Sequence, residues 1–483
     1  MSGKSSNFAR KIKTINSRKM TTNETKGFYK LSWLQRIGFG SGDLAQNLIF
    51  QTTCMYLLFF YTDIYGLDAV DVSVMFTVGN VANVIWDPIV GALIDKNNPK
   101  LGKYRAYLVF VGIPLTGFAI LCFWNGFAPS LLYAYVTYIA MTLLYTFINV
   151  PYGALNSSLT RDTDEITILT SVRMFMANCG GLAVGSGLPL LIAYFTDQEA
   201  EGLPKDPAAW FTTMTIYALV GLALLFFCFS QCKERVVMDA SDAANVKISD
   251  LWMEFFHNRP LRVIAFFFIT AFAMMSIGNA AGAYFINSNM HGSPDQLSIF
   301  MGLGSAPSFI FMPLVPMIKK MVGKKNMFYI FLGIAIVGMA FLYVAAKMEE
   351  PSMTIVYIAQ FVKSTGVIVA TGYMWALVPE VISYGEYVSG KRIAGIVNAL
   401  TGIFFKAGMT LGSVVAPAIL AYVSYNPEVI EQTPEAEEGI LWLVCVIPAV
   451  LLMLAIFIIS KYELTDDVID DINKKIEARA ATE

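Results

Sequence analysis

Residues 209–231, which read AWFTTMTIYALVGLALLFFCFSQ, form a run of 23 residues without a charged side chain. An α-helix rises about 1.5 Å per residue, so a helix of this length spans the ~30 Å hydrocarbon layer of a bilayer. The chain contains eleven more long apolar runs, separated by Gly, Pro and polar clusters. They lie at 37–62, 70–94, 105–125, 131–158, 167–195, 260–287, 296–318, 326–346, 353–383, 396–424 and 440–460. The sequence therefore predicts an all-α membrane protein with twelve transmembrane helices.

The composition supports this prediction. Of the 483 residues, 56% are hydrophobic and 14% are charged, whereas soluble domains average about 25% charged residues. The net charge of −2 gives no reason to expect a nucleic-acid partner. The six cysteines show no CxxC spacing, and His257 and His291 lie far apart, so we expect no metal site and no cofactor. The first 35 residues are polar and basic, so we expect no cleaved signal peptide.

Basic residues are distributed unevenly between the two sets of loops. One side carries almost all of them, whereas the other carries only Lys205 and Lys347. Because short loops rich in Lys and Arg stay in the cytoplasm, the sequence predicts a multi-pass protein of the cytoplasmic membrane with both termini cytoplasmic. The basic positions lie at 96–105, 161, 233–262, 319–325 and 391–392.

An internal repeat divides the chain in two. Gly185-Ser186 and Pro189 in the fifth run correspond to Gly412-Ser413 and Pro417 in the eleventh, at an offset of 227 to 228 residues. Such repeats build two pseudo-symmetric halves, here of six helices each, around a site near the membrane midplane. The predicted segments are a basic tail (1–36), an N-terminal half (37–231), a central cytoplasmic loop (232–259), a C-terminal half (260–460) and a cytoplasmic tail (461–483).

Five polar side chains lie at a similar depth in five different helices. A charge within hydrocarbon costs roughly 2.5–3.5 kcal/mol on insertion scales, so each one needs a reason. At about 1.5 Å per residue, all five lie on the order of 10–15 Å from the cytoplasmic boundary. We interpret the set as the lining of a shared cavity; the alternative is a structural salt-bridge cluster between the halves. The five are Asp43, Asp87, Asn149, Arg173 and Lys406.

The same helices carry amides, hydroxyl groups and aromatic rings. Sugars need this mixture, because carboxylates and amides bind hydroxyl groups and an aromatic face covers the apolar face of a sugar ring. Packing or contact with the lipid interface is the alternative for any single ring. The set consists of Asn47, Asn83, Tyr145, Thr146, Tyr152, Tyr373, Trp375 and Tyr384. From it we place Asn47 and Trp375 in the substrate site.

Several motifs then follow one another in an order typical of a known family. They are Gly40-Ser41-Gly42-Asp43, the segment 61–67 (YTDIYGL), Asp87-Pro88-Ile89-Val90-Gly91, Gly102-Lys103-Tyr104-Arg105, the segment 149–155 (NVPYGAL), Trp375-Ala376-Leu377-Val378-Pro379-Glu380 and Tyr384-Gly385-Glu386-Tyr387. Over nearly its whole length, the chain resembles the glycoside-pentoside-hexuronide:cation symporters, the melibiose permease group of the major facilitator superfamily.

The resemblance implies the major facilitator fold and a division of roles among the polar residues. It places Asp43, Arg173 and Lys406 in or beside the sugar site, and Tyr145 and Asn149 at sugar positions of the fourth helix. It places Asp87, Asn83 and Thr146 at positions of the cation-coupling site, for H⁺ or Na⁺.

The sequence departs from the melibiose permease pattern at five positions. Asn80 stands in place of an arginine, Asn83 in place of the first cation-site aspartate, and Trp86 in place of an asparagine. Asn149 replaces an aspartate, and Gly153 replaces a tryptophan. The cation site is therefore poorer in oxygen ligands than the family pattern.

The remaining charges at these positions sum to zero, because there are two aspartates, Asp43 and Asp87, and two cations, Arg173 and Lys406. Such a pocket needs no cation to neutralise it. A hard cation such as Na⁺ prefers several oxygen ligands including carboxylates, whereas a proton needs only one carboxylate whose pKa changes with its surroundings. We therefore expect coupling to H⁺ through Asp87 in preference to Na⁺.

These observations predict a secondary active transporter of a glycoside, an oligosaccharide or a related sugar, working by alternating access. We expect a monomer in contact with membrane lipids. A sugar uniporter or exchanger without ion coupling and a transporter of a lipid-like substrate on the same fold are the alternatives. The sequence shows no nucleophile–base pair and no soluble catalytic domain, so we do not expect an enzyme or a membrane-embedded sensor.

Overall fold

The computed structural model describes residues 29–97, 99–160, 163–196, 203–235, 255–348, 351–389, 394–429 and 431–480. Much of the expected N-terminal tail and of the expected central loop lies outside the described residues. Every regular element within these ranges is a helix.

The helices α2 to α8 form what we call the N-terminal half. Its first helix, α2 (Trp33–Thr52), continues through two π-helical turns, η1 (Thr53–Leu57) and η2 (Phe60–Ile64). The helices that follow are α3 (Ala69–Lys96), α4 (Ala106–Phe110), α5 (Gly112–Leu121), α6 (Leu131–Leu159), α7 (Thr163–Phe195) and α8 (Pro207–Gln231).

The helices α10 to α18 form the C-terminal half, which α19 follows. In order, these elements are α10 (Arg259–Tyr284), η3 (Phe285–Asn289), α11 (Pro294–Phe311), η4 (Met312–Leu314), α12 (Val315–Val322), α13 (Lys324–Ala346), α14 (Met353–Met374), α15 (Leu377–Ser389), α16 (Ala394–Tyr422), α17 (Pro434–Leu441), η5 (Trp442–Val446), α18 (Ile447–Ser460) and α19 (Asp466–Ala480).

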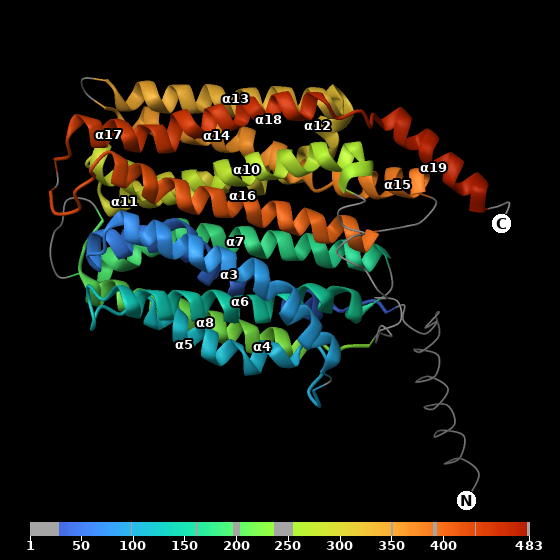
Figure 1. The fold of residues 1–483 in the computed structure, drawn as a ribbon, viewed down its shortest axis with the longest axis horizontal. Coiled ribbons are helices and arrows are strands. Elements are labelled where there is room, and N and C mark those ends of the chain that lie inside the picture. The colour runs from blue at the N-terminus through green and yellow to red at the C-terminus, as the bar shows by residue number, and fades with distance from the viewer. Residues whose placement is uncertain are drawn as a thin grey trace, which may run out of the picture.

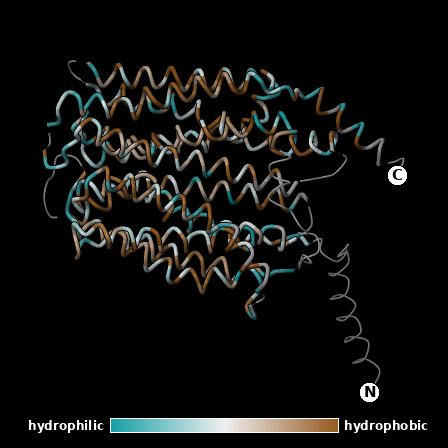
Figure 2. The backbone as a smooth tube through the Cα atoms, viewed as in Figure 1, coloured by the Kyte–Doolittle hydropathy of each residue, from teal (hydrophilic) through white to brown (hydrophobic). Residues whose placement is uncertain are grey.

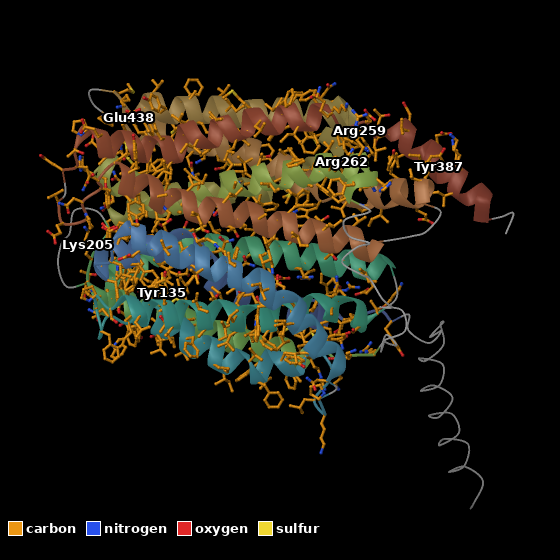
Figure 3. All side chains as sticks on the ribbon, viewed as in Figure 1. Tyr135, Lys205, Arg259, Arg262, Tyr387 and Glu438 are labelled. Carbon is orange, nitrogen blue, oxygen red and sulfur yellow. The ribbon has the colours of Figure 1, made fainter. Side chains whose placement is uncertain are left out.

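The long helices run side by side in one bundle (Figure 1). Within the halves, α2 packs against α7 and α8, and α10 packs against α16. Between the halves, α3 packs against α16, α7 against α11, and η1 against α10. We call the end of the bundle where α19 lies the tail end, and the opposite end the far end. Figure 3 shows Arg259, Arg262 and Tyr387 at the tail end, and Lys205 and Glu438 at the far end.

Ten helices within the described ranges are long and apolar enough to cross a membrane. The two other predicted spans are interrupted: the first is divided among α2, η1 and η2, and the third between α4 and α5. Hydrophobic residues run along the helices and hydrophilic residues concentrate at their ends (Figure 2). This arrangement agrees with the prediction of a twelve-helix membrane protein.

Polar residues at the helix starts explain where several spans begin. Ser32 caps α2 and Ser293 caps α11, each in a capping box with a glutamine three residues later. Asp68 and Asp206 accept hydrogen bonds from the first turns of α3 and α8. These side chains satisfy backbone N–H groups that have no partner within the helix.

Candidate substrate-binding site

A cavity of about 310 Å³ lies between the two halves. Ligand pockets range from about 300 to 1,000 Å³, so this volume suits a small ligand. Its polar lining comes mainly from α2, α3 and α6, while α10 and α16 close it from the C-terminal half. The lining residues are Asp43, Gln46, Asn47, Ile49, Phe50, Thr53, Cys54, Leu58, Phe76, Asn80, Asn83, Val84, Tyr138, Met141, Thr142, Tyr145, Thr146, Asn149, Val150, Ser276, Ala280, Phe405, Lys406, Met409, Thr410 and Ser413.

Most of the residues that the sequence assigns to the substrate and coupling sites lie at this cavity. Those in the lining are Asp43, Asn47, Asn83, Tyr145, Thr146, Asn149 and Lys406. Asp87, Arg173 and Trp375 are not among the lining residues in the part of the chain that the structure describes. Asp87 and Arg173 nevertheless contact residues that are.

Asp43 forms an ion pair with Arg173 from α7. Arg173 Nε lies 2.5 Å from Oδ2 of Asp43, and Nη2 lies 3.3 Å from Oδ1. The hydroxyl group of Tyr152 lies 3.0 Å from Oδ2 as well. The guanidinium group sits 4.8 Å from the ring centroid of Tyr152 and 5.6 Å from that of Phe39, both cation–π distances. A side chain at Gly42 would collide with the Tyr152 ring, so this glycine permits the close approach.

Lys406 of α16 forms an ion pair with Asp87 of α3, and this contact joins the two halves. Lys406 lines the cavity, whereas Asp87 is not among the described lining residues. Within the part of the chain that the structure describes, Oδ1 of Asp87 and Oδ1 of Asn83 are both buried and have no hydrogen-bond partner. The two residues are four apart on α3 and therefore share a face. Unpaired buried acceptors are costly, so this part of α3 favours an added hydrogen-bond donor, a proton or a cation.

Amide side chains supply further hydrogen-bonding groups at the cavity. Asn149 donates a 3.2 Å hydrogen bond to Oε1 of Gln46. Asn80 donates a 2.8 Å hydrogen bond across the two halves to the Ser413 hydroxyl group. The sequence analysis did not assign Gln46, Asn80 or Ser413 to the site. The helical period could have signalled Gln46, which is three residues after Asp43 on α2.

Aromatic rings border the same space. Tyr145 stacks on Phe50 with ring centroids 5.8 Å apart, and both residues line the cavity. Trp375 follows the last residue of α14 and packs against Phe268 of α10 at 4.9 Å. Its centroid is 6.3 Å from that of Phe405, which does line the cavity. The C-terminal half therefore contributes the Phe405 ring to the cavity lining, and Trp375, which the sequence analysis assigned to the substrate site, lies next to that ring.

The arrangement brings the five polar groups of similar predicted depth into one region. Asp43, Asn149 and Lys406 line the cavity, and Arg173 and Asp87 pair with two of them. Both cations are therefore paired with an aspartate, Arg173 with Asp43 and Lys406 with Asp87.

Comparison with known protein families identifies the family of this chain. Residues 38–466 match the family of MFS/sugar transport proteins. The chain belongs to this family. The protein is therefore a multi-pass membrane transporter and not an enzyme, and the resemblance to the glycoside-pentoside-hexuronide:cation symporters is confirmed.

Individual relatives of this sugar transport family member span almost the same length. The uncharacterized symporter YnaJ of Bacillus subtilis is 39% identical over 454 residues, which are 93% of this chain and 96% of YnaJ. The isoprimeverose transporter of Lactiplantibacillus pentosus is 28% identical over 417 residues, 85% of each chain. Among solved structures, the nucleoside transporter NupG superposes with a TM-score of 0.60 at 14% identity, covering 89% of this chain and all of NupG. This likeness confirms the major facilitator fold.

Proposed function

We propose that this protein is a cation-coupled transporter that carries a glycoside or a related sugar across the cytoplasmic membrane by alternating access. One observation carries the proposal: the cavity between the halves combines a carboxylate, amides, hydroxyl groups and aromatic rings. Sugars need such polar and aromatic partners together. The isoprimeverose transporter and the symporter YnaJ support the same class of activity by relationship.

Each polar residue has a proposed role. Arg173 holds Asp43 in place through their ion pair, and Trp375 packs against the Phe405 ring and fixes its position. The residues that contact the sugar are Asp43, Asn47, Tyr145, Asn149 and Lys406.

The coupling ion is proposed to be a proton bound at Asp87. Asn83 lies one turn from Asp87 on α3, Asn83 and Thr146 both line the cavity, and Asp87 is paired with the lining residue Lys406. A carboxylate exchanging between Lys406 and a proton changes its charge as the halves rearrange. The closed Asp87–Lys406 pair also favours a second candidate, a sugar uniporter, because a permanent pair would need no ion.

The proposal includes the orientation and the assembly of the protein. We propose that the tail end and both termini face the cytoplasm, because loops rich in Lys and Arg favour that side. The halves 37–231 and 260–460 are proposed to rock about the cavity as two bodies, joined by the loop 232–259. Because one chain encloses the cavity between its own halves, a monomer suffices.

Uptake by proteoliposomes that contain the purified full-length protein tests this function. A panel of labelled glycosides is offered with an imposed proton gradient, an imposed sodium gradient, or neither. Accumulation driven by the proton gradient supports the proposal. Uptake that survives the loss of both gradients unchanged favours the uniporter, and binding of no sugar in the panel contradicts sugar transport.

A further inference from the structure

We propose that the cavity selects uncharged glycosides and excludes acidic sugars that carry a carboxylate or a sulfonate. This inference rests on the proposed function, because it names the substrate class of the same site.

The charge balance of the cavity is the first step. Among the lining residues that the structure describes, only Asp43 and Lys406 are charged. Asp43 is paired with Arg173 and Lys406 with Asp87, so each charge already has a partner of opposite sign. The four side chains are 15% to 38% exposed, so water screens them only in part.

An aspartate already balances the charge of each cation, so neither cation is left over as the counter-ion of an anionic ligand. The guanidinium group of Arg173 contacts both oxygens of Asp43 and stacks over the rings of Tyr152 and Phe39. The ammonium group of Lys406 has three N–H donors and can contact a sugar while it stays paired with Asp87, but that pairing already balances its charge. An acidic sugar therefore adds a negative charge that has no counter-ion of its own, and burying such a charge is unfavourable.

The same geometry accommodates a neutral hydroxyl group. An ionised carboxylate has about four acceptor sites. Arg173 uses two of them on Asp43, and the Tyr152 hydroxyl group lies within reach of a third. One acceptor remains for a sugar O–H group. Besides Asp43 and Lys406, the described lining carries amide and hydroxyl groups, such as those of Asn47 and Thr142, which bind hydroxyl groups without requiring charge.

Matched pairs of sugars test this inference directly. The panel contains neutral hexosides, pentosides and disaccharides, each paired with the uronide that carries a carboxylate in place of the CH₂OH group or of a ring hydrogen. Competition against uptake of a labelled neutral glycoside is measured in proteoliposomes with the full-length protein. We expect each uronide to compete at least about tenfold more weakly than its neutral partner, because its charge has no counter-ion in the cavity.

A charge-changing variant tests the cause. Asp87→Asn removes the counter-ion of Lys406. The ratio of the inhibitory concentration of a uronide to that of its neutral partner should therefore fall by about tenfold. Equilibrium exchange is the readout, since it needs no driving gradient. The control is Asp471→Asn, which removes a carboxylate from α19 that is 61% exposed and pairs with Lys475. That variant should keep the wild-type ratio.

Each outcome decides the matter. A uronide that competes as well as its neutral partner overturns the inference and leaves sugar transport standing. An unchanged ratio in Asp87→Asn overturns the proposed cause. If that variant does not reach the membrane, the comparison of neutral and acidic sugars with the wild-type protein alone decides the selectivity. Failure of every sugar, neutral or acidic, would reject the proposed function and with it the inference.

Discussion

Asp63 and Tyr425 come from opposite halves of the protein, and the Tyr425 hydroxyl group donates a 2.9 Å hydrogen bond to Oδ1 of Asp63. Nζ of Lys205 lies 3.2 Å from the same oxygen, and the Asp63 side chain is 0% exposed. Lys205 also donates to the carbonyl oxygen of Pro427, which is two residues beyond Tyr425. The three side chains therefore tie the halves together at the far end.

Other contacts reinforce this closure. The hydroxyl groups of Thr62 and Tyr284 lie 2.8 Å apart, and Ser186 and Ser298 exchange two hydrogen bonds of 2.7 and 3.0 Å. Both pairs cross between the halves. Alternating access requires these contacts to break when the far end opens.

Tyr425→Phe is expected to loosen the far end. The variant keeps the ring but removes a hydrogen bond to a charged group, which contributes about 1.5–3 kcal/mol. The open population should therefore rise by about tenfold or more. The readout is the rate at which an impermeant maleimide, added from the far side, labels Cys54, a lining residue, after replacement of the other five cysteines.

The matched control for this variant is Tyr422→Phe. Tyr422 is the last residue of α16, three positions before Tyr425, and is 78% exposed, so the loss of its hydroxyl group should leave the labelling rate unchanged. Equal labelling rates for Tyr425→Phe and the control would show that the Asp63–Tyr425 contact does not hold the far end closed.

Asp43→Asn is expected to abolish sugar binding and to lower stability. It leaves Arg173 without its counter-ion, which costs about 1–3 kcal/mol at this partial exposure, below the ~3–5 kcal/mol of a fully buried pair. Binding is measured by titration calorimetry and stability by thermal unfolding. The double variant Asp43→Asn/Arg173→Gln should recover stability but not binding. Near-normal binding by the single variant would argue against a role for this carboxylate at the sugar.

Lys324→Met is expected to destabilise the tail end. The Lys324 side chain is 4% exposed, and its Nζ lies 2.7 Å from Glu380 and 3.3 Å from Asp466. Removing this cation leaves the Glu380 carboxylate, which is 14% exposed and still accepts a hydrogen bond from Tyr462, without its counter-ion, at a cost of up to about 3–5 kcal/mol. The melting temperature should fall well below that of Lys320→Met, whose side chain is exposed. Similar melting temperatures for the two variants would contradict this account.

The pH dependence of stability should report on Asp466. Burial opposes its ionisation, but Lys319 and Lys324 outweigh burial and lower the pKa of Asp466 below its ordinary value of 3.8. A lowered pKa in the folded state stabilises the protein above the unfolded pKa, and this stabilisation is lost as the pH falls through the folded pKa. The melting temperature should therefore fall more steeply between about pH 5 and pH 3 in the wild type than in Asp466→Asn. Asp467→Asn, on the exposed neighbour, should follow the wild type.

The depth of the polar residues could be predicted from sequence, because a helix advances by a fixed rise per residue. Counting residues from the loop ends was enough to place Asp43, Asn149 and Lys406 at one level, and all three line the cavity. The choice of ion-pair partners could not be predicted in this way. It depends on which helices pack together, and α2 packs against α7 whereas α3 packs against α16.

The sequence analysis did not predict the local breaks in the helices. The η1 turn lies within the predicted run 37–62, and counting apolar residues does not distinguish a π-helical turn from an α-helical one. At Val111, between α4 and α5, the following Gly112 and Pro114 are a signal for a break that the sequence analysis did not use. The sequence analysis also could not predict that Phe405, and not Trp375, lines the cavity. Trp375 stands at the break between α14 and α15, where it turns onto α10, and only tertiary packing sets that direction.

Asp87→Asn is expected to separate sugar movement from its driving force. The carboxyl group of Asp87 can hold a proton when Lys406 is distant and release it when the ammonium group returns, because a nearby cation favours the charged form. The asparagine keeps the shape of the side chain but cannot carry the proton. Accumulation against a concentration gradient should be lost, whereas equilibrium exchange of sugar should continue.

Two measurements distinguish this proton carrier from its alternatives. Wild-type uptake should respond to an imposed pH gradient and respond weakly or not at all to sodium, since Asn83 and Trp86 stand where the family pattern has an aspartate and an asparagine. Strong, saturable sodium dependence would contradict our interpretation of α3. If Asp87 were instead paired permanently with Lys406, the asparagine variant would retain whatever accumulation the wild type shows. Loss of accumulation in Asp87→Asn, with exchange preserved, would support the proton at Asp87.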